Sequence, residues 1–150
     1  MRWLPHVTVA AIIEQENKFL LVEENINGQL LLNQPAGHWE NGETLIEAVI
    51  RETLEETAGH FTPEYLVGIY QWQVPNNPGQ IYLRFAFAGS ISHFETDFIL
   101  DDPIVRTVWY DYEALLDTRH QHRSPQLLQC VDDYRTGKCY SLDCLVNVKN

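Results

Sequence analysis

The segment Thr44–Thr57 restricts the folds open to this chain more than any other feature, because it predicts a helix with two unlike sides. Thr44 and Glu47, three residues apart, form a capping box that marks where the helix begins. One side of the segment carries apolar residues such as Ile46 and Ile50. A helix with one apolar side must cover a neighbouring layer, so this segment cannot stand alone in solvent.

Strand-like segments stand on both sides of this helix. Each is a run of apolar and β-branched residues bounded by polar or turn-forming residues, which is the pattern of a β-strand. The turn Glu14–Asn17 and the loop Asn33–Gly42 separate some of them, and two further helices follow at the end of the chain. The expected strands are His6–Ile13, Lys18–Glu24, Leu30–Leu32, Tyr65–Trp72, Ile81–Ile91 and Ile104–Tyr110, and the later helices are Asp111–Leu116 and Gln126–Arg135.

This order of elements predicts an α/β fold in which helices are layered on a sheet. The connections between the strands are mostly too short for helical crossovers, so we expect a mixed sheet rather than an all-parallel one. The chain has 150 residues, of which 45% are hydrophobic and 21% are charged. These values fit one domain spanning residues 1–150.

Charge and composition exclude several classes of protein. The formal net charge is −11, which argues against long nucleic acid as a partner because that partner requires clustered Lys and Arg. No apolar run approaches the roughly 18 residues of a membrane span. We interpret the first residues as leading into a strand rather than as a signal peptide. The three cysteines, Cys130, Cys139 and Cys144, form no C-x-x-C pair, so we expect reduced thiols and a cytoplasmic protein.

Six of the 21 acidic residues lie between Gly37 and His60. Within the predicted helix, Glu52, Glu55 and Glu56 share one face by their i, i+3 and i+4 spacing. Like charges on one stripe repel, and a bound Mg²⁺ or Mn²⁺, which prefers carboxylate oxygens, would offset that cost. The alternative is an ordinary acidic stripe exposed to water. The six acidic residues are Glu40, Glu43, Glu47, Glu52, Glu55 and Glu56.

Arg51 lies beside this acidic stripe. Its side chain can pair with Glu47 or Glu55 one turn away, or reach Glu43 at the start of the helix. Such a pair is either an ordinary surface ion pair, worth under about 1 kcal/mol, or a brace that orients metal ligands.

Together these residues resemble the signature of the Nudix family, G-x5-E-x7-R-E-U-x-E-E-x-G-U, where U is a bulky aliphatic residue. Two positions depart from it. Thr53 takes an aliphatic position, and Ala58 takes the place of the late glycine. Gly59 follows Ala58, and we expect it to cap the helix one residue late. The matching residues are Gly37, Glu43, Arg51, Glu52, Glu55 and Glu56.

The resemblance implies an α/β/α sandwich with a mixed sheet and a loop–helix–loop signature. It also implies that Glu52, Glu55 and Glu56 bind magnesium, joined by the Gly37 carbonyl, with manganese as a substitute. Glu43 then holds Arg51 and the loop. The implied chemistry is attack of water on a phosphorus atom, with metals orienting the phosphates and neutralising charge.

The general base differs between branches of such a family. Glu55 or Glu52 is the first choice in this chain, and Asp101 or Asp102 is the second.

Segments outside the signature, among them PHVTVA, FLLVEE, NQPAGH and LRFAFA, resemble a bacterial phosphatase branch of the family. This implies hydrolysis of nucleoside tri- and diphosphates and of hydroxymethylpyrimidine pyrophosphate, with release of inorganic phosphate. Cleavage of ADP-ribose or of dinucleoside polyphosphates, or a sensor domain without catalysis, are the alternatives. The partner is then a small nucleotide or pyrimidine diphosphate, bound by a monomer or a homodimer.

Four side chains are candidates for contact with that substrate. Arg84 lies on an apolar strand, and a charge there needs an anionic partner, either a substrate phosphate or a carboxylate. Trp72 and Trp39 are candidates to stack on a base or pyrimidine ring, although core packing is the more common role of a single tryptophan. Arg123, in a loop, is a weaker candidate for phosphate contact, because loop arginines are usually solvated.

Overall fold

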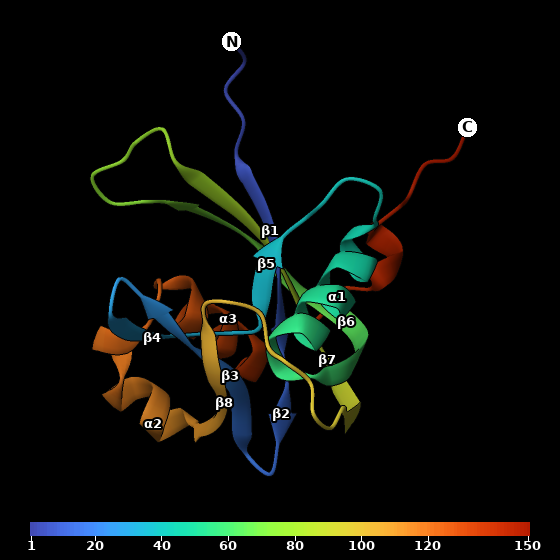
Figure 1. Ribbon diagram of the computed structural model, residues 1–150. Helices are drawn as coiled ribbons and strands as arrows, with labels where there is room; N and C mark the ends of the chain where they lie inside the picture. The colour runs from blue at the N-terminus through green and yellow to red at the C-terminus, as the bar shows by residue number, and fades with distance from the viewer.

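Two four-stranded sheets form the centre of the protein in a computed structural model that describes residues 1–150 (Figure 1). The first sheet has the order β5-β1-β7-β6, and in the second the central strand β3 pairs with β8 on one side and with β2 and β4 on the other. The pair β1–β7 is parallel and the other pairs are antiparallel, so the predicted mixed sheet is confirmed. The strands are β1 His6–Ile12, β2 Glu14–Gln15, β3 Lys18–Ile26, β4 Gln29–Asn33, β5 Ala36–His38, β6 Gly59–Gln73, β7 Ile81–Phe94 and β8 Ile104–Asp111.

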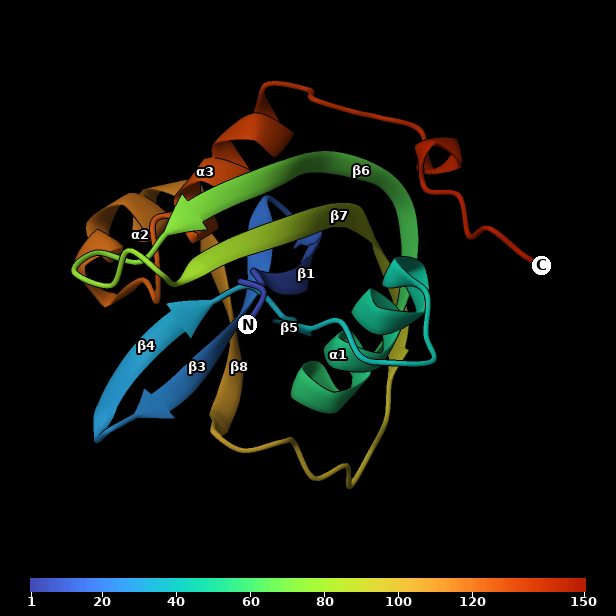
Figure 2. The same ribbon diagram turned by 90° about the horizontal axis from the view of Figure 1, so that it is seen from above.

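Helix α1 lies on the opposite side of β1 and β7 from α2 and α3 (Figure 2). Successive residues of a strand point to opposite faces of a sheet, and β1 shows this directly. Its residue Val9 packs with Val49 of α1, whereas Ile12 packs with Leu127 of α3. This layered α/β arrangement confirms the predicted fold class. None of the helices has both the length and the apolar character that a membrane span needs. The helices are α1 Leu45–Thr57, α2 Tyr112–Asp117 and α3 Gln126–Arg135, with short 3-10 turns at Arg119–Gln121 and Leu142–Cys144.

The capping box of α1 is present as predicted. The backbone N–H of Glu47 donates to Thr44 Oγ1 at 3.1 Å, and the N–H of Thr44 donates to Glu47 Oε1 at 3.2 Å. Thr53, which departs from the signature, is fully buried, and its hydroxyl donates to the Val49 carbonyl at 2.7 Å. The polar group is therefore satisfied inside the helix and needs no further partner.

Several strands differ from the prediction, and the short β2 lies within the predicted turn Glu14–Asn17. Strand β6 begins at Gly59 rather than at Tyr65, and its pairing with β7 shifts register in three places, one of them beside Pro63. A proline interrupts strand pairing but is tolerated at a bulge, which is why the sequence pattern placed the start of this strand too late. Strand β5 lies within the predicted loop Asn33–Gly42, where it pairs with the edge of β1.

The expectation that Gly59 caps α1 is wrong. Ala58 is the C-cap, with a left-handed φ of 64°, and its N–H donates to the Leu54 carbonyl at 2.8 Å. Gly59 already belongs to β6. The helix thus ends where the signature places its glycine, and an alanine adopts a conformation that glycine adopts without a steric penalty.

Ala58→Gly should therefore stabilise the protein. The left-handed conformation costs a non-glycine residue roughly 1–2 kcal/mol, and the greater freedom of glycine in the unfolded chain offsets part of that gain. We expect the free energy of unfolding to rise by about 0.5–1 kcal/mol. Ala114→Gly, in the helical interior of α2, is the control, and it should lower that energy. Urea unfolding of both variants measures the free energy of unfolding. An equal decrease of that energy in both variants would contradict backbone strain at Ala58.

Candidate active site

A cavity of about 530 Å³ opens between the two sheets, beside strand β5 and helix α1. Its walls come from parts of the chain that are far apart in sequence. Helix α1 contributes Glu52 and Glu56, β7 contributes Arg84, and the segment before β8 contributes Asp101 and Asp102. The predicted acidic stripe thus faces a cavity rather than open solvent.

Two of the three acids on the stripe line this cavity, and both are largely buried. Glu56 Oε1 accepts a hydrogen bond from the Ala36 N–H at 2.9 Å. Burial, reinforced by the nearby Glu24 carboxylate, raises the pKa of Glu56 to about 9. Burial also raises the pKa of Glu52 to about 7, although Arg51 acts in the opposite direction. Both side chains are costly to ionise unless a cation is present.

The third acid, Glu55, is not part of the cavity wall, and its side chain is 34% exposed. Its pKa is raised by burial and, more weakly, by the Asp101 carboxylate. The Glu55 backbone carbonyl also accepts the Asp101 N–H at 3.0 Å, which fixes the segment before β8 against α1. Asp101, the second choice of base, is therefore a direct neighbour of Glu55, the first choice.

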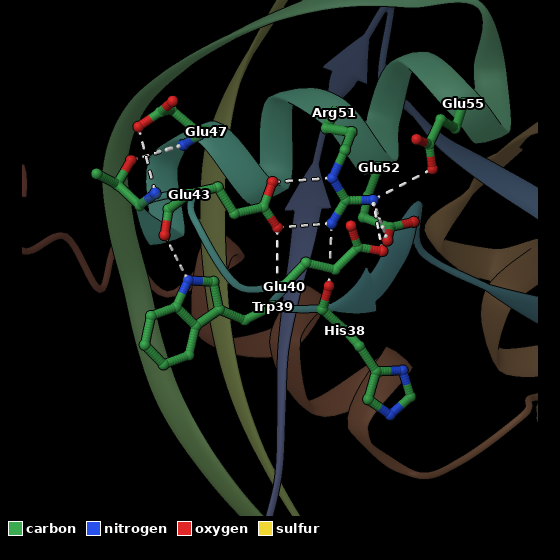
Figure 3. Close-up of polar contacts among 9 residues, drawn as sticks. His38, Trp39, Glu40, Glu43, Glu47, Arg51, Glu52 and Glu55 are labelled. Atoms are coloured by element: carbon green, nitrogen blue, oxygen red, sulfur yellow. Dashed lines mark hydrogen bonds and ion pairs between the residues drawn. The ribbon is translucent and has the colours of Figure 1, made fainter.

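Arg51 connects the stripe to the loop that precedes it (Figure 3). Its Nε and Nη2 donate to the two oxygens of Glu43 at 2.9 and 2.7 Å, which is a bidentate pair. Nη1 donates to Glu52 at 2.8 Å and to Glu55 at 3.2 Å, and Nη2 also donates to the His38 carbonyl. The arginine lowers the pKa of Glu43 and keeps that carboxyl ionised. The guanidinium thus orients two of the acids of the stripe.

Gly37 is in contact with one of these acids. A Cβ atom at this position would lie 2.1 Å from the carboxyl carbon of Glu52, far inside any permitted contact. Gly37 pairs with Val9 at the edge of the first sheet, so the backbone cannot move away without breaking that pairing. Any larger residue at this position would displace the Glu52 carboxylate from its present place.

Arg84 carries a buried charge with no anionic partner. The residue is only 4% exposed, and its Nη1 and Nη2 donate to Gln34 and Asn33 at 2.8 and 3.3 Å. No carboxylate lies within ion-pair distance of it, and its Nε has no hydrogen-bond partner. The sequence left two anionic partners open for Arg84, a carboxylate of the protein or a phosphate of the substrate. The structure places no carboxylate beside it, and contact with a phosphate stays a prediction.

The remaining candidates for substrate contact lie in different settings. Trp72 lines the cavity beside Tyr82, with their ring centroids 6.0 Å apart. Arg123 also lines the cavity, but it pairs with Glu24. Trp39 is half exposed and is not part of the cavity wall, and its indole N–H donates to the Glu43 carbonyl at 2.7 Å.

Glu24 and Gln126 are among the residues of the cavity wall that were not predicted from the sequence. They are 5% and 7% exposed, and each has a buried Oε1 atom without a hydrogen-bond partner. Together with Arg84 Nε, these are the three unpaired buried side-chain atoms of the protein, and all three residues line this cavity. For Glu24 a signal existed, because two successive acids at the end of an apolar strand place one of them toward each face.

Known proteins resemble this chain over most of its length. A family profile described as NUDIX domain matches residues 4–130. The phosphatase NudJ of Escherichia coli strain K12 is 39% identical over 141 residues, which cover 94% of this chain and 90% of the relative. The solved structure of a NUDIX hydrolase from Nitrosomonas europaea is 49% identical, covers 97% of this chain and 98% of its own, and gives a TM-score of 0.93.

A more distant solved structure shares only the fold. The NUDIX domain of Shewanella oneidensis NrtR, in complex with ADP ribose, is 18% identical, covers 89% of this chain and 88% of its own, and gives a TM-score of 0.68. Hydrolases of this kind generally use a divalent metal, and the residues of the cavity fit one. Carboxylate oxygens are the preferred ligands of hard divalent cations, and Glu24 adds a buried oxygen without a partner.

The raised pKa values predict how stability depends on pH without metal. The folded-state pKa of Glu52 and of Glu56 lies above the ordinary value of 4.5, so between these values the folded protein binds more protons than the unfolded chain. In chelating buffer, the contribution of these groups to the free energy of unfolding should fall as pH rises from 4.5 toward about 7 for Glu52 and about 9 for Glu56.

Glu56→Gln is the matched variant for this measurement, because an amide oxygen can still accept the Ala36 N–H. As pH rises from 5 to 9, the free energy of unfolding of the variant should become progressively larger than that of the unchanged protein. A difference independent of pH would show that Glu56 is ionised in the folded protein at every pH tested.

Proposed function

This chain belongs to the Nudix hydrolase family, and we propose that it is a magnesium-dependent phosphohydrolase acting on nucleoside tri- and diphosphates and hydroxymethylpyrimidine pyrophosphate. The products are inorganic phosphate and the dephosphorylated compound. One observation carries the proposal: a single cavity holds the acids Glu52 and Glu56 together with the unpaired cation of Arg84. A polyphosphate bound with Mg²⁺ satisfies both charges, since its metal meets the acids and its oxygens meet the arginine.

Glu52, Glu55 and Glu56 are the residues that hold the metal. When bound, Mg²⁺ supplies an activated water and neutralises charge that develops on the phosphate oxygens. Arg51 positions Glu52 and Glu55 through its Nη1 atom. Gly37 keeps the space that the Glu52 carboxylate occupies.

The proton of the attacking water needs a base in the cavity. Glu52 or Glu55 is proposed, since their pKa values are raised toward the range in which a carboxylate accepts a proton near neutral pH. Glu52 lines the cavity, whereas Glu55 lies next to it, and Asp101 and Asp102, which also line the cavity, are the second choice.

The wall opposite the acids is proposed to recognise the organic part of the substrate. Trp72 and Tyr82 offer aromatic surface for a heterocyclic ring. Gln126 presents an unpaired acceptor oxygen, which fits an amino group of a nucleobase or an aminopyrimidine. The relative NudJ, whose name describes it as a phosphatase, supports phosphate release over cleavage of ADP-ribose.

We place this activity in the cytoplasm, acting on small molecules. The support is chemical: Cys130 is buried and reduced, and Cys139 and Cys144 are exposed free thiols, which a reducing compartment preserves.

A phosphate-release screen tests the proposed function. Nucleoside di- and triphosphates, hydroxymethylpyrimidine pyrophosphate, ADP-ribose and dinucleoside polyphosphates are compared at equal concentration with Mg²⁺. We expect inorganic phosphate from the first two classes, no activity in excess chelator, and recovery with Mg²⁺ or Mn²⁺. If AMP from ADP-ribose is the main product, the protein is an ADP-ribose hydrolase instead. If no compound is turned over, the protein is a nucleotide sensor without catalysis.

Glu55→Gln is the inactive control for that screen. It keeps the shape of the side chain and removes its charge, so kcat/KM should fall about 100-fold or more, equivalent to about 2.7 kcal/mol of transition-state stabilisation. Stability should not fall, because one repulsion on the helix is relieved.

Arg84→Gln tests the contact with phosphate. The amide can still bond to the side chains around it, but it carries no charge for a phosphate. We expect kcat/KM to fall by about 10- to 100-fold for every phosphorylated substrate, or about 1.4–2.7 kcal/mol. The matched control is Arg106→Gln, which removes an arginine that pairs with Glu23 outside the cavity. Unchanged kinetics for Arg84→Gln with an intact fold would show that this charge is structural.

A further inference from the structure

We propose that His60, His93 and Glu95 form a second metal site, for a first-row transition ion such as Zn²⁺, separate from the carboxylate site. Strands β6 and β7 form an antiparallel pair, and the active-site residues Trp72 and Arg84 lie at one end of it. His60 and His93 lie at the other end, and none of the three residues lines the cavity.

The three side chains converge on one position. Their ligand atoms all lie within 4.8 Å of one another. His60 Nε2 lies 2.6 Å and His93 Nε2 lies 3.9 Å from the same oxygen, Glu95 Oε1. Zinc ligands at about 2.0–2.1 Å from the ion stand roughly 3.3 Å apart. The three side chains are partly or largely exposed. Their ligand atoms can therefore move by up to about one ångström, as zinc binding requires, without disturbing the core.

A β-bulge brings the two histidines together. Gly59 pairs with Phe94 and Phe61 pairs with Ile91, so the single residue His60 stands opposite both Ser92 and His93. The two imidazole rings stack with centroids 4.1 Å apart and planes 17° from parallel. Both Nε2 atoms lie near the same oxygen of Glu95.

Ser92 fixes the orientation of one ring. Its Oγ lies 3.0 Å from His93 Nδ1, which leaves His93 Nε2 to bind an ion. A partner on the second ring nitrogen is the usual companion of a metal-bound histidine, because it sets the tautomer and the ring angle. A simple ion pair between His60 and Glu95 requires neither His93 nor Ser92.

The ligand set selects the class of ion. Imidazole nitrogens suit Zn²⁺, Ni²⁺ and Cu²⁺, whereas Mg²⁺ prefers an oxygen environment. Two histidines and one carboxylate leave a fourth tetrahedral position for water, and the exposure of His93 and Glu95 keeps that position open.

An ion at this site would connect three parts of the fold. Glu95 donates its N–H to the carbonyl of Ala58, the residue that ends α1. The segment after Glu95 then leads to Asp101, whose N–H bonds to Glu55. The ion would therefore hold β6, β7 and the end of the catalytic helix together, and by mass action its binding stabilises the folded chain.

Zinc titration in the presence of several millimolar Mg²⁺, which occupies the carboxylate site, tests the proposal. Calorimetry should show one tight Zn²⁺ site, and the melting temperature should rise with Zn²⁺. A positioned neighbour of a metal ligand is worth about 10- to 100-fold in metal affinity, so we expect His93→Ala, which removes a ligand itself, to weaken Zn²⁺ binding by about 100-fold or more and to abolish the shift in melting temperature.

His120→Ala, which removes an exposed histidine elsewhere, is the matched control and should bind Zn²⁺ as the unchanged protein does. Because His93 is exposed and outside the cavity, His93→Ala should fold normally and keep its magnesium-supported phosphate release. A failure of the proposed function would leave this result unaffected, since calorimetry measures binding alone. The site does not exist if the protein has no tight Zn²⁺ site, or if His93→Ala binds Zn²⁺ equally well.

Discussion

The arrangement of the active site depends on Arg51. Its guanidinium donates five hydrogen bonds, which reach Glu43 in the loop before α1, the His38 carbonyl on β5, and Glu52 and Glu55 on the helix. These carboxylates would repel one another without the cation between them, and removing a partner from a buried charge is costly. Loop, strand and helix are thereby fixed relative to one another before a ligand binds, which is the preorganisation that catalysis requires.

The cavity contains buried charged groups that lower the stability of the free protein. The groups on one side are acidic, and the group on the other side is basic. On one side, Glu52 and Glu56 resist ionisation because they are buried near other acids. On the other side, Arg84 is buried among amides that carry no charge to match its own. A protein selected for stability alone would neutralise each group with an internal partner. Because the acids and Arg84 are not paired with each other, both remain available to bind a ligand. The loss of stability that this causes is common at enzyme active sites.

Local features of this chain could be predicted from sequence, and long-range ones could not. The bounds of α1, its capping box and the pairing of Arg51 with Glu43 and Glu55 follow from residues close together in the sequence. Strand β5 depends on pairing with β1, which the turn-forming residues around it conceal. Gln126 reaches the cavity only because α3 packs behind the sheets. The amide partners of Arg84 come from the end of β4 and the residue after it, about fifty positions earlier in the chain.

Strand β5 also has a consequence for the behaviour of the protein in concentrated solution. An unpaired strand edge is a template for association with other chains, and β1 would present such an edge if β5 were absent. Three residues of β5, with Gly37 at their centre, cover it. The glycine that makes room for the Glu52 carboxylate therefore also belongs to the segment that protects the sheet from aggregation. Selection on the reaction and selection on solubility act on the same backbone.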